Sequence, residues 1–139
     1  MPKKSVLFLC TGNSCRSQIA EAITNHLLGQ TWQAFSAGTQ PAGYVHPLAL
    51  QVLAEIGIQH QGTSKSAEVF RSQPFDRVIT VCDDAAETCP VWLGRGARAH
   101  LGFPDPAKAA GTPEEVLAVF RQVRDDIRAQ VVDFLKLNG

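Results

Sequence analysis

The chain has 139 residues, enough for one domain, and its 13 basic and 13 acidic side chains leave no net charge at neutral pH. This balance disfavours nucleic acid and anionic membranes as partners, and no apolar run approaches the roughly 20 residues of a membrane-spanning helix. The N-terminal segment and the apolar run after it are too short for a signal peptide, and the four cysteines suit a reducing compartment. We therefore expect a cytoplasmic protein. We also expect it to be one domain over residues 1–139 that acts as a monomer.

Strands and helices alternate along the chain. The run from Val6 to Cys10 is apolar, as expected of a parallel strand buried on both faces, and helical spacing begins at about Gln18 and ends at Gly29. His46-Pro47 opens a second helix. In chain order, strands are predicted at residues 6–10, 31–36, 76–82 and 97–101, a second helix at 46–56, one helical turn at 66–71 and about two turns at 85–89.

The last helix carries the clearest signals. Thr112, Pro113 and Glu115 have the pattern of an N-cap, a first helical residue and a capping-box glutamate. Beyond them, one face is apolar at Val116, Phe120, Val123, Ile127, Val131 and Phe134. We therefore expect this helix to dock on the sheet.

The alternation predicts an α/β fold, a parallel sheet with helices on both faces, because β-α-β connections are right-handed crossovers. In open sheets of this kind the ligand binds beyond the carboxyl ends of the strands. Cys10, Cys82 and Asp105 fall at or just past such ends, on three different strands. The sequence therefore predicts that these three side chains converge.

The most informative stretch is the loop between the first strand and the first helix. Five residues separate Cys10 from Arg16, and Gly12 with Asn13 can adopt positive φ angles that turn successive amides inward. The helix N-terminus adds N–H donors, and the Arg16 guanidinium can hold two oxygens of a tetrahedral anion. We predict an oxyanion site formed by Thr11, Gly12, Asn13, Ser14, Cys15, Arg16 and Ser17.

Cys10 is the candidate nucleophile of this loop. A helix N-terminus and a neighbouring arginine both favour the reactive thiolate form of a cysteine. Two other interpretations are open: a cysteine at a strand end can be simple core, and a glycine-containing turn before a helix can bind a nucleotide. The nucleotide interpretation lacks a G-x-G-x-x-G or G-K-[ST] motif.

The loop, together with Phe35-Ser36-Ala37-Gly38 and Asp105-Pro106, resembles the low-molecular-weight protein tyrosine phosphatase superfamily. More narrowly, the chain is similar to the thioredoxin-coupled arsenate reductases, because Gln18 stands where the phosphatases usually have proline and because Cys82 is followed by Cys89. The resemblance implies a four-stranded parallel sheet of order 2-1-3-4. That order places the strands ending in Cys10 and Cys82 side by side, about 4.8 Å apart, a spacing that permits a disulfide.

The resemblance also implies a role for each residue of the site. Cys10 would attack arsenic, Asp105 would protonate the departing oxygen as general acid, and Ser17 would donate to the Cys10 sulfur. Cys82 would then attack Cys10 and expel arsenite, and Cys89 would attack Cys82. Thioredoxin would reduce the resulting Cys82–Cys89 disulfide, which we expect to be exposed.

This relay requires residues 83–88 to change shape. If they are helical, Cys82 and Cys89 stand about 10.5 Å apart along the helix axis, beyond the reach of a disulfide. We therefore predict a short helix that unwinds on oxidation.

Other interpretations stay open. A phosphatase would use Cys10 and Asp105 to hydrolyse a phosphomonoester through a cysteinyl-phosphate, and weak activity of this kind is expected of a reductase too. A non-catalytic module would bind an oxyanion without turnover, and phosphate or sulfate would compete with arsenate in the same loop. Asp105 could be a plain Asp-Pro turn, Ser17 a helix cap, and Cys82 and Cys89 unrelated thiols. A glutaredoxin system could replace thioredoxin as electron donor.

No bound cofactor is expected. Cys15 is assigned no redox role, and the cysteine spacings contain no C-x-x-C pair typical of zinc sites. Some members of the family bind potassium through residues that match Asn13, Glu21, Ser36 and Thr63. Lys65 stands at the position of their further, acidic ligand. Its ammonium would replace the ion, so we expect little activation by potassium.

Overall fold

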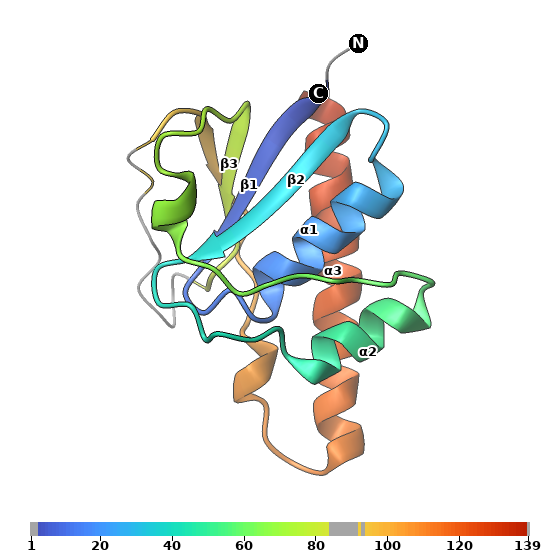
Figure 1. Cartoon of the computed structure of the whole chain (residues 1–139). Helices are drawn as coiled ribbons and strands as arrows, with labels where there is room; N and C mark the ends of the chain where they lie inside the picture. The colour runs from blue at the N-terminus through green and yellow to red at the C-terminus, as the bar shows by residue number, and fades with distance from the viewer. Residues whose placement is uncertain (1–2, 84–91, 93, 139) are drawn as a thin grey trace.

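The computed structural model describes residues 3–83, 92 and 94–138. Within them four parallel strands form one sheet in the order β2-β1-β3-β4, which confirms the predicted α/β class and strand order (Figure 1). The elements are β1 (Lys4–Cys10), α1 (Arg16–Leu27), β2 (Trp32–Gly38), α2 (Pro47–Glu55), the 3₁₀ helix η1 (Ala67–Phe70), β3 (Arg77–Thr80), β4 (Ala97–His100), the 3₁₀ helix η2 (Pro106–Lys108) and α3 (Pro113–Asn138).

The element boundaries differ from the predicted ones by a few residues. The first helix, α1, begins at Arg16 instead of Gln18 and ends at Leu27, two residues before Gly29. The second strand, β2, continues past Ser36 because its last residue, Gly38, still pairs with Cys10 of β1. The third strand is shorter than predicted. The helical turns predicted at residues 85–89 lie outside the described residues.

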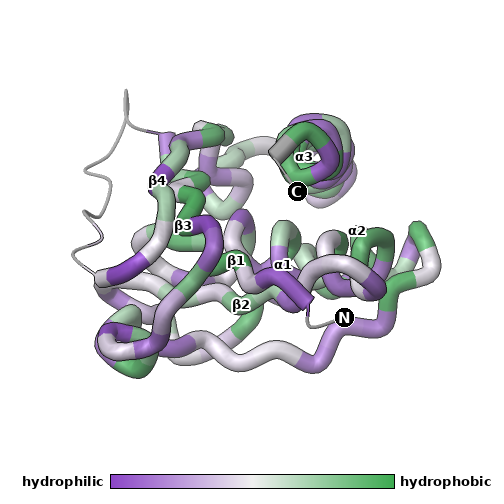
Figure 2. The backbone as a smooth tube through the Cα atoms, turned by 90° about the horizontal axis from the view of Figure 1, so that it is seen from above, coloured by the Kyte–Doolittle hydropathy of each residue, from purple (hydrophilic) through white to green (hydrophobic). Residues whose placement is uncertain are grey.

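The helices α1, α2 and α3 cover one face of the sheet, and Figure 2 shows them together on that side. Side chains that alternate along β1 separate the two faces, because successive residues of a strand point to opposite sides. Val6 and Phe8 pack under the helices, whereas Leu7 and Leu9 pack on the opposite face. Both pairs are almost completely buried, so β1 is the central strand of the core.

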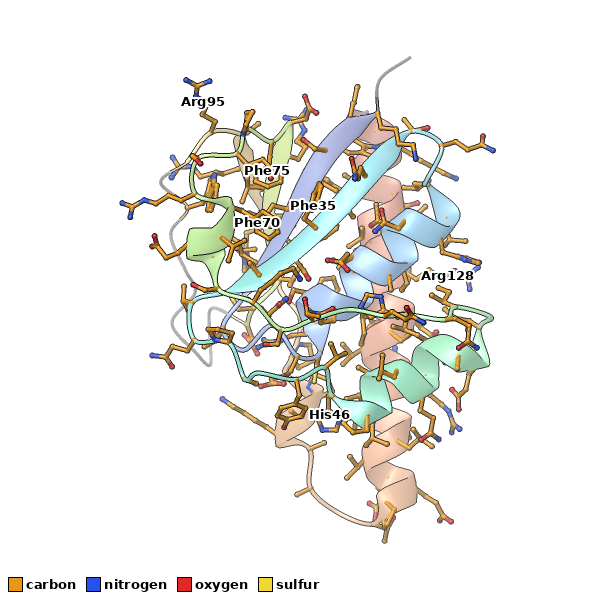
Figure 3. The ribbon with its side chains drawn as sticks, viewed as in Figure 1. Phe35, His46, Phe70, Phe75, Arg95 and Arg128 are labelled. Carbon is orange, nitrogen blue, oxygen red and sulfur yellow. The ribbon has the colours of Figure 1, made fainter. Side chains whose placement is uncertain are left out.

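The opposite face is covered by η1 and a cluster of aromatic rings. Phe35, Phe70 and Phe75 gather there, as Figure 3 shows, with ring centroids 5.5 to 5.9 Å apart in edge-to-face contacts. Trp92 packs against Phe75 at 6.0 Å. Both faces of the sheet are therefore covered, one by α-helices and the other by a 3₁₀ helix and aromatic side chains.

The last helix, α3, starts as predicted. The Glu115 amide donates to the Thr112 hydroxyl, and the Thr112 amide donates to the Glu115 carboxylate, both at 3.1 Å. Of the predicted apolar face, Phe120, Ile127 and Val131 are fully buried. The helix contacts mainly α1 and α2, instead of docking chiefly on the sheet as expected. Although α3 has 26 residues, no helix among the described residues is both long and apolar enough to cross a membrane.

Candidate active site

The loop from Cys10 to Arg16 passes over the carboxyl end of β2. Gly38 makes this passage possible, because a Cβ atom on it would collide with the Thr11 carbonyl and would lie 3.0 Å from the Asn13 amide nitrogen. Asn13 adopts a left-handed conformation with φ of 49°. Gly12, which was also expected to have a positive φ, does not, so that prediction is wrong. Asn13 alone makes the turn, and its side chain is anchored by the Lys65 amide at 2.9 Å.

Donors outside the loop hold its carbonyl groups. Three come from the segment that follows β2 and one from the Ser64 hydroxyl. The Thr11 carbonyl accepts from Gln40, the Gly12 carbonyl from Ala42 and Ser64, and the Ser14 carbonyl from His46, at 2.8 to 3.1 Å. With its carbonyls engaged there, the loop presents its amide side to the pocket, as an anion-binding nest does.

The loop surrounds a pocket of about 240 Å³. Its lining includes every residue from Cys10 to Arg16 together with Asp105 and Lys108. The predicted convergence of Cys10 with Asp105 is therefore found, and Arg16 joins them. Ser17 lies behind the lining, where it contacts the sulfur of Cys10.

Arg16 and Asp105 face each other across this pocket. The Arg16 side chain is 4% exposed, and its Nη1 donates to the Phe103 carbonyl at 3.1 Å. Its Nη2 lies 3.8 Å from Oδ2 of Asp105, while Oδ1 of Asp105 accepts from the Ala107 amide at 3.0 Å. One carboxylate oxygen thus caps η2 and the other faces the guanidinium. Asp105 is both a turn residue and a member of the site.

Cys10 is buried at the end of β1, where two groups meet its sulfur. The Asn13 amide donates to Sγ at 3.2 Å, and the Ser17 hydroxyl lies 2.8 Å from it. The contact predicted between Ser17 and the sulfur is therefore present. Both contacts hold the sulfur in place at the edge of the pocket.

Cys15 has a different environment from Cys10. It is buried, and burial raises the pKa of its thiol to about 12, with the carboxylate of Asp105 and the sulfur of Cys10 acting in the same direction. The Ser14 hydroxyl, 3.6 Å away, opposes this shift only in part. A pKa raised in this way keeps the Cys15 thiol protonated at neutral pH.

Cys82 follows the strand that pairs with β1. The ladder between the two strands continues past β3, since the Val81 amide donates to the Leu9 carbonyl at 2.9 Å. Cys82 is disulfide-bonded and fully buried, whereas Cys10 and Cys15 are free thiols. The exposure expected of the disulfide is therefore not found at Cys82. Residues 83–88 were predicted to unwind, and of these residues 84–88 lie outside the described residues, as does Cys89.

Two of the residues matched to a potassium site, Thr63 and Glu21, lie next to the Lys65 ammonium. Its Nζ donates to the Thr63 carbonyl at 2.8 Å and lies 3.9 Å from Oε1 of Glu21. Ser36 donates to the same Glu21 oxygen at 2.9 Å. Burial raises the pKa of Glu21 and lowers that of Lys65, while their mutual attraction opposes both shifts.

Two contributors to the site were missed at the sequence level. The Phe103 carbonyl holds Arg16, and His60 lies with Nε2 at 2.7 Å from Oε1 of Gln18 and 3.8 Å from Oε2 of Glu21. Burial and the nearby Lys65 ammonium lower the pKa of His60, so its ring is neutral at neutral pH. These contacts join residues 87 and 42 positions apart, and no local pattern signals them.

The chain is similar to known proteins both in sequence and in structure. The family model described as low molecular weight phosphotyrosine protein phosphatase matches residues 5–137. An arsenate reductase of Halalkalibacterium halodurans is 47% identical over 135 residues, which cover 96% of each chain. A solved arsenate reductase in its oxidised state gives a TM-score of 0.79 at 29% identity, over 98% of this chain and 99% of that one.

A third similar protein is named for its electron donor. The thioredoxin-dependent arsenate reductase of Corynebacterium glutamicum gives a TM-score of 0.69 at 28% identity, covering 99% of this chain and 62% of that one. These similarities span the strands, the loop from Cys10 to Arg16 and the segment that carries Asp105. The chain therefore belongs to the low molecular weight phosphotyrosine protein phosphatase family and, within it, to the arsenate reductases.

Proposed function

We propose that this chain reduces arsenate to arsenite and thereby serves arsenic detoxification. The observation that carries the proposal is the free Cys10 thiol inside an oxyanion pocket, on a strand adjacent to the one that leads to the disulfide-bonded Cys82. A hydrolase of this fold needs only the first of these features. The second, once an external dithiol has reduced its disulfide to thiols, supplies the electron pair that a reduction requires.

The first step is attack of the Cys10 thiolate on arsenic. The loop amides and Arg16 hold the arsenate oxygens, and Asp105 gives its proton to the oxygen that departs as water. The Cys82 thiolate then attacks the Cys10 sulfur, and the electron pair of the S–As bond passes to arsenic. Arsenic(V) leaves as arsenite, arsenic(III), and a Cys10–Cys82 disulfide remains.

The second half of the cycle returns Cys10 to its thiol form. Cys89 attacks Cys82, which releases the Cys10 thiolate and moves the disulfide to Cys82 and Cys89. Because Cys82 is fully buried, we expect thioredoxin to attack the sulfur of Cys89. The dithiol of thioredoxin then takes up the oxidising equivalent, and a glutaredoxin system is the alternative donor.

Further features of the protein follow from the same proposal. Phosphate and sulfate should compete with arsenate, since all three are tetrahedral oxyanions of similar charge. No resident cofactor is needed, because the electrons come from thiols. We further propose a monomer that acts in the cytoplasm, where thioredoxin keeps cysteines reduced.

The second candidate is hydrolysis of phosphomonoesters, which the family of this chain favours. Cys10, Arg16 and Asp105 are shared by both reactions. Water, instead of Cys82, would resolve the covalent intermediate, and the enzyme would return without a change of redox state. We expect this to be a weak side activity.

The proposal is tested by arsenate-dependent NADPH oxidation with thioredoxin and thioredoxin reductase. We expect Cys10→Ser, Cys82→Ser and Cys89→Ser each to abolish multiple turnover, because each removes one sulfur of the relay. Background oxidation without arsenate is the control. Hydrolysis of p-nitrophenyl phosphate should survive in the Cys82 and Cys89 variants only. Full turnover by Cys82→Ser would refute the relay and favour the phosphatase.

A further inference from the structure

The oxyanion pocket is lined by a second basic residue besides Arg16. Lys108 lines it together with Asp105, and both belong to the turn that forms η2, the short orange helix beyond the carboxyl ends of the strands in Figure 1. Asp105 is the N-cap of this 3₁₀ helix and Lys108 is its last residue. A 3₁₀ helix has about three residues per turn, so side chains three positions apart lie on the same side. Lys108 therefore stands on the side of η2 from which Asp105 reaches the pocket.

The backbone of η2 is fixed beside the pocket. The Lys108 amide donates to the Asp105 carbonyl at 3.2 Å, and the Ala107 amide donates to Oδ1 of Asp105 at 3.0 Å. Pro106 is buried. The turn also contacts α3. The main chain of Lys108 is thereby held in place, while its four-carbon side chain can adjust to a ligand.

The two cations of the pocket differ in how their charge is engaged. The Arg16 guanidinium is 4% exposed, donates to the Phe103 carbonyl at 3.1 Å and lies 3.8 Å from Oδ2 of Asp105. Lys108 is exposed, and within residues 3–83, 92 and 94–138 its ammonium has no hydrogen-bond or ion-pair partner. The oxygens of Asp105 face Ala107 and Arg16 instead. The Lys108 ammonium is therefore available to a ligand.

The charges of the proposed reaction leave a place for this ammonium. An arsenate anion must come close to the Cys10 thiolate, and Arg16 supplies a single positive charge. Burial keeps the pKa of Cys15 at about 12, so its thiol adds no charge. Asp105 is protonated when it acts as the acid. A second cation at the pocket lowers the electrostatic cost of bringing the two anions together.

The lining offers no surface for an organic group. None of the described residues that line the pocket is aromatic, and none is leucine, isoleucine, valine or methionine. A free tetrahedral oxyanion turns a charged or hydroxyl oxygen away from the nucleophile, and such an oxygen accepts from an ammonium. A phosphomonoester has its organic group on that oxygen. An ammonium beside it favours the free anion over the ester.

We propose that Lys108 is a specificity-determining residue, which donates to the outward oxygen of the bound anion and selects inorganic oxyanions over phosphomonoesters. The residue contacts the substrate and takes no part in proton or electron transfer. This inference deepens the proposed function and rests on the loop from Cys10 to Arg16 holding the oxyanion.

The test measures the binding of two probes to the reduced protein by isothermal titration calorimetry. Inorganic phosphate is the free oxyanion, and phenylphosphonate is a stand-in for an ester that cannot be hydrolysed. Lys108→Gln removes the charge at similar length, and Lys108→Arg keeps it. We expect the Kd of phosphate to rise about fivefold in the glutamine variant and to change by less than about twofold in the arginine variant. The Kd of phenylphosphonate should change by less than about twofold in both.

A matched control is Lys136→Gln, because Lys136 is an exposed lysine of α3 that does not line this pocket. It should bind both probes as wild type does. Equal losses of phosphate and phenylphosphonate binding in Lys108→Gln would indicate only long-range attraction between opposite charges and would overturn the inference. Unchanged phosphate binding in that variant would overturn it too.

Arsenate reduction gives a second readout on the same proteins. Lys108→Gln should raise KM for arsenate about fivefold and leave kcat nearly unchanged, because Lys108 holds the oxyanion and not the nucleophile. The difference from wild type should narrow as salt is added, since an exposed charge is screened. A lower kcat at unchanged KM would contradict the inference. The selective loss of phosphate binding in a protein that does not reduce arsenate would refute the proposed function and leave this inference standing.

Discussion

At the scale of single residues, Lys65 shows how one substitution can replace a ligand. Its ammonium lies 2.8 Å from the Thr63 carbonyl and 3.9 Å from the Glu21 carboxylate, among the groups that match potassium ligands in other family members. A side-chain ammonium is tethered and needs no ion from solution. The positive charge beside Glu21 is then carried by the chain itself, and we propose that the enzyme does not depend on potassium.

This proposal predicts that kcat/KM for arsenate changes by less than about twofold between potassium and sodium chloride at equal ionic strength. Lys65→Ala removes the ammonium and should respond more strongly to potassium than wild type. Steady-state kinetics of both proteins in each salt provide the measurement. A large and selective potassium activation of wild type would show that the ammonium does not replace the ion.

At the scale of elements, the capping box predicted at the start of α3 is present in the structure. Thr112 and Glu115 satisfy each other's amides at 3.1 Å, and the hydrogen bonds to Thr112 lower the pKa of Glu115. All groups of this motif lie within four consecutive residues. The motif could therefore be recognised without knowledge of the rest of the fold.

Removing the cap should destabilise the protein measurably. Thr112→Ala leaves an amide of the first turn without its acceptor and should cost about 1 kcal/mol of unfolding free energy. Thr112→Ser keeps the hydroxyl and is the matched control. Urea unfolding gives both values, with an unchanged m-value expected. Equal stabilities for the alanine and serine variants would mean that the cap contributes nothing.

At the scale of the whole molecule, α2 and α3 are joined by a carboxylate between two arginines. Glu55 of α2 accepts from Arg121 at 2.7 Å and from Arg124 at 2.9 Å, and Arg124 also donates to the Val52 carbonyl. These hydrogen bonds, led by those from Arg121, lower the pKa of Glu55 in the folded protein. A lowered folded-state pKa means that the contribution to stability is present above the unfolded-state value and is lost as the pH falls.

The linkage predicts a pH-dependent effect of Glu55→Gln. The variant should unfold at lower urea concentration than wild type at pH 7, and the difference should close as the pH falls below about 4, where the unfolded-state carboxyl is protonated. Glu68→Gln is the control, because Glu68 and its partner Arg71 are both largely exposed. A difference of the same size at pH 7 and at pH 3 would contradict the linkage.

Much of the architecture could be predicted from local patterns. The apolar run of β1, the proline at the start of α2 and the capping box of α3 each identify an element, and alternation then implies a parallel sheet. The boundaries were less accurate, since Gly38 extends β2 only through its pairing with Cys10. Within the site, the C-x₅-R loop and Asp105 could be identified because their chemistry depends on residue type and position along the chain.

The amino-acid sequence by itself determined the order of elements, the C-x₅-R loop that we propose to hold an oxyanion and the cysteine at its edge, because these depend on short-range spacing and on intrinsic conformational preference. Only the tertiary structure decided how the loop is held. The Phe103 carbonyl on Arg16 and the His60 ring on Gln18 are contacts between distant segments. Hydrogen bonds and ion pairs of this kind require groups to meet within a few ångströms, and a linear pattern does not encode that meeting until the sheet and helices have packed.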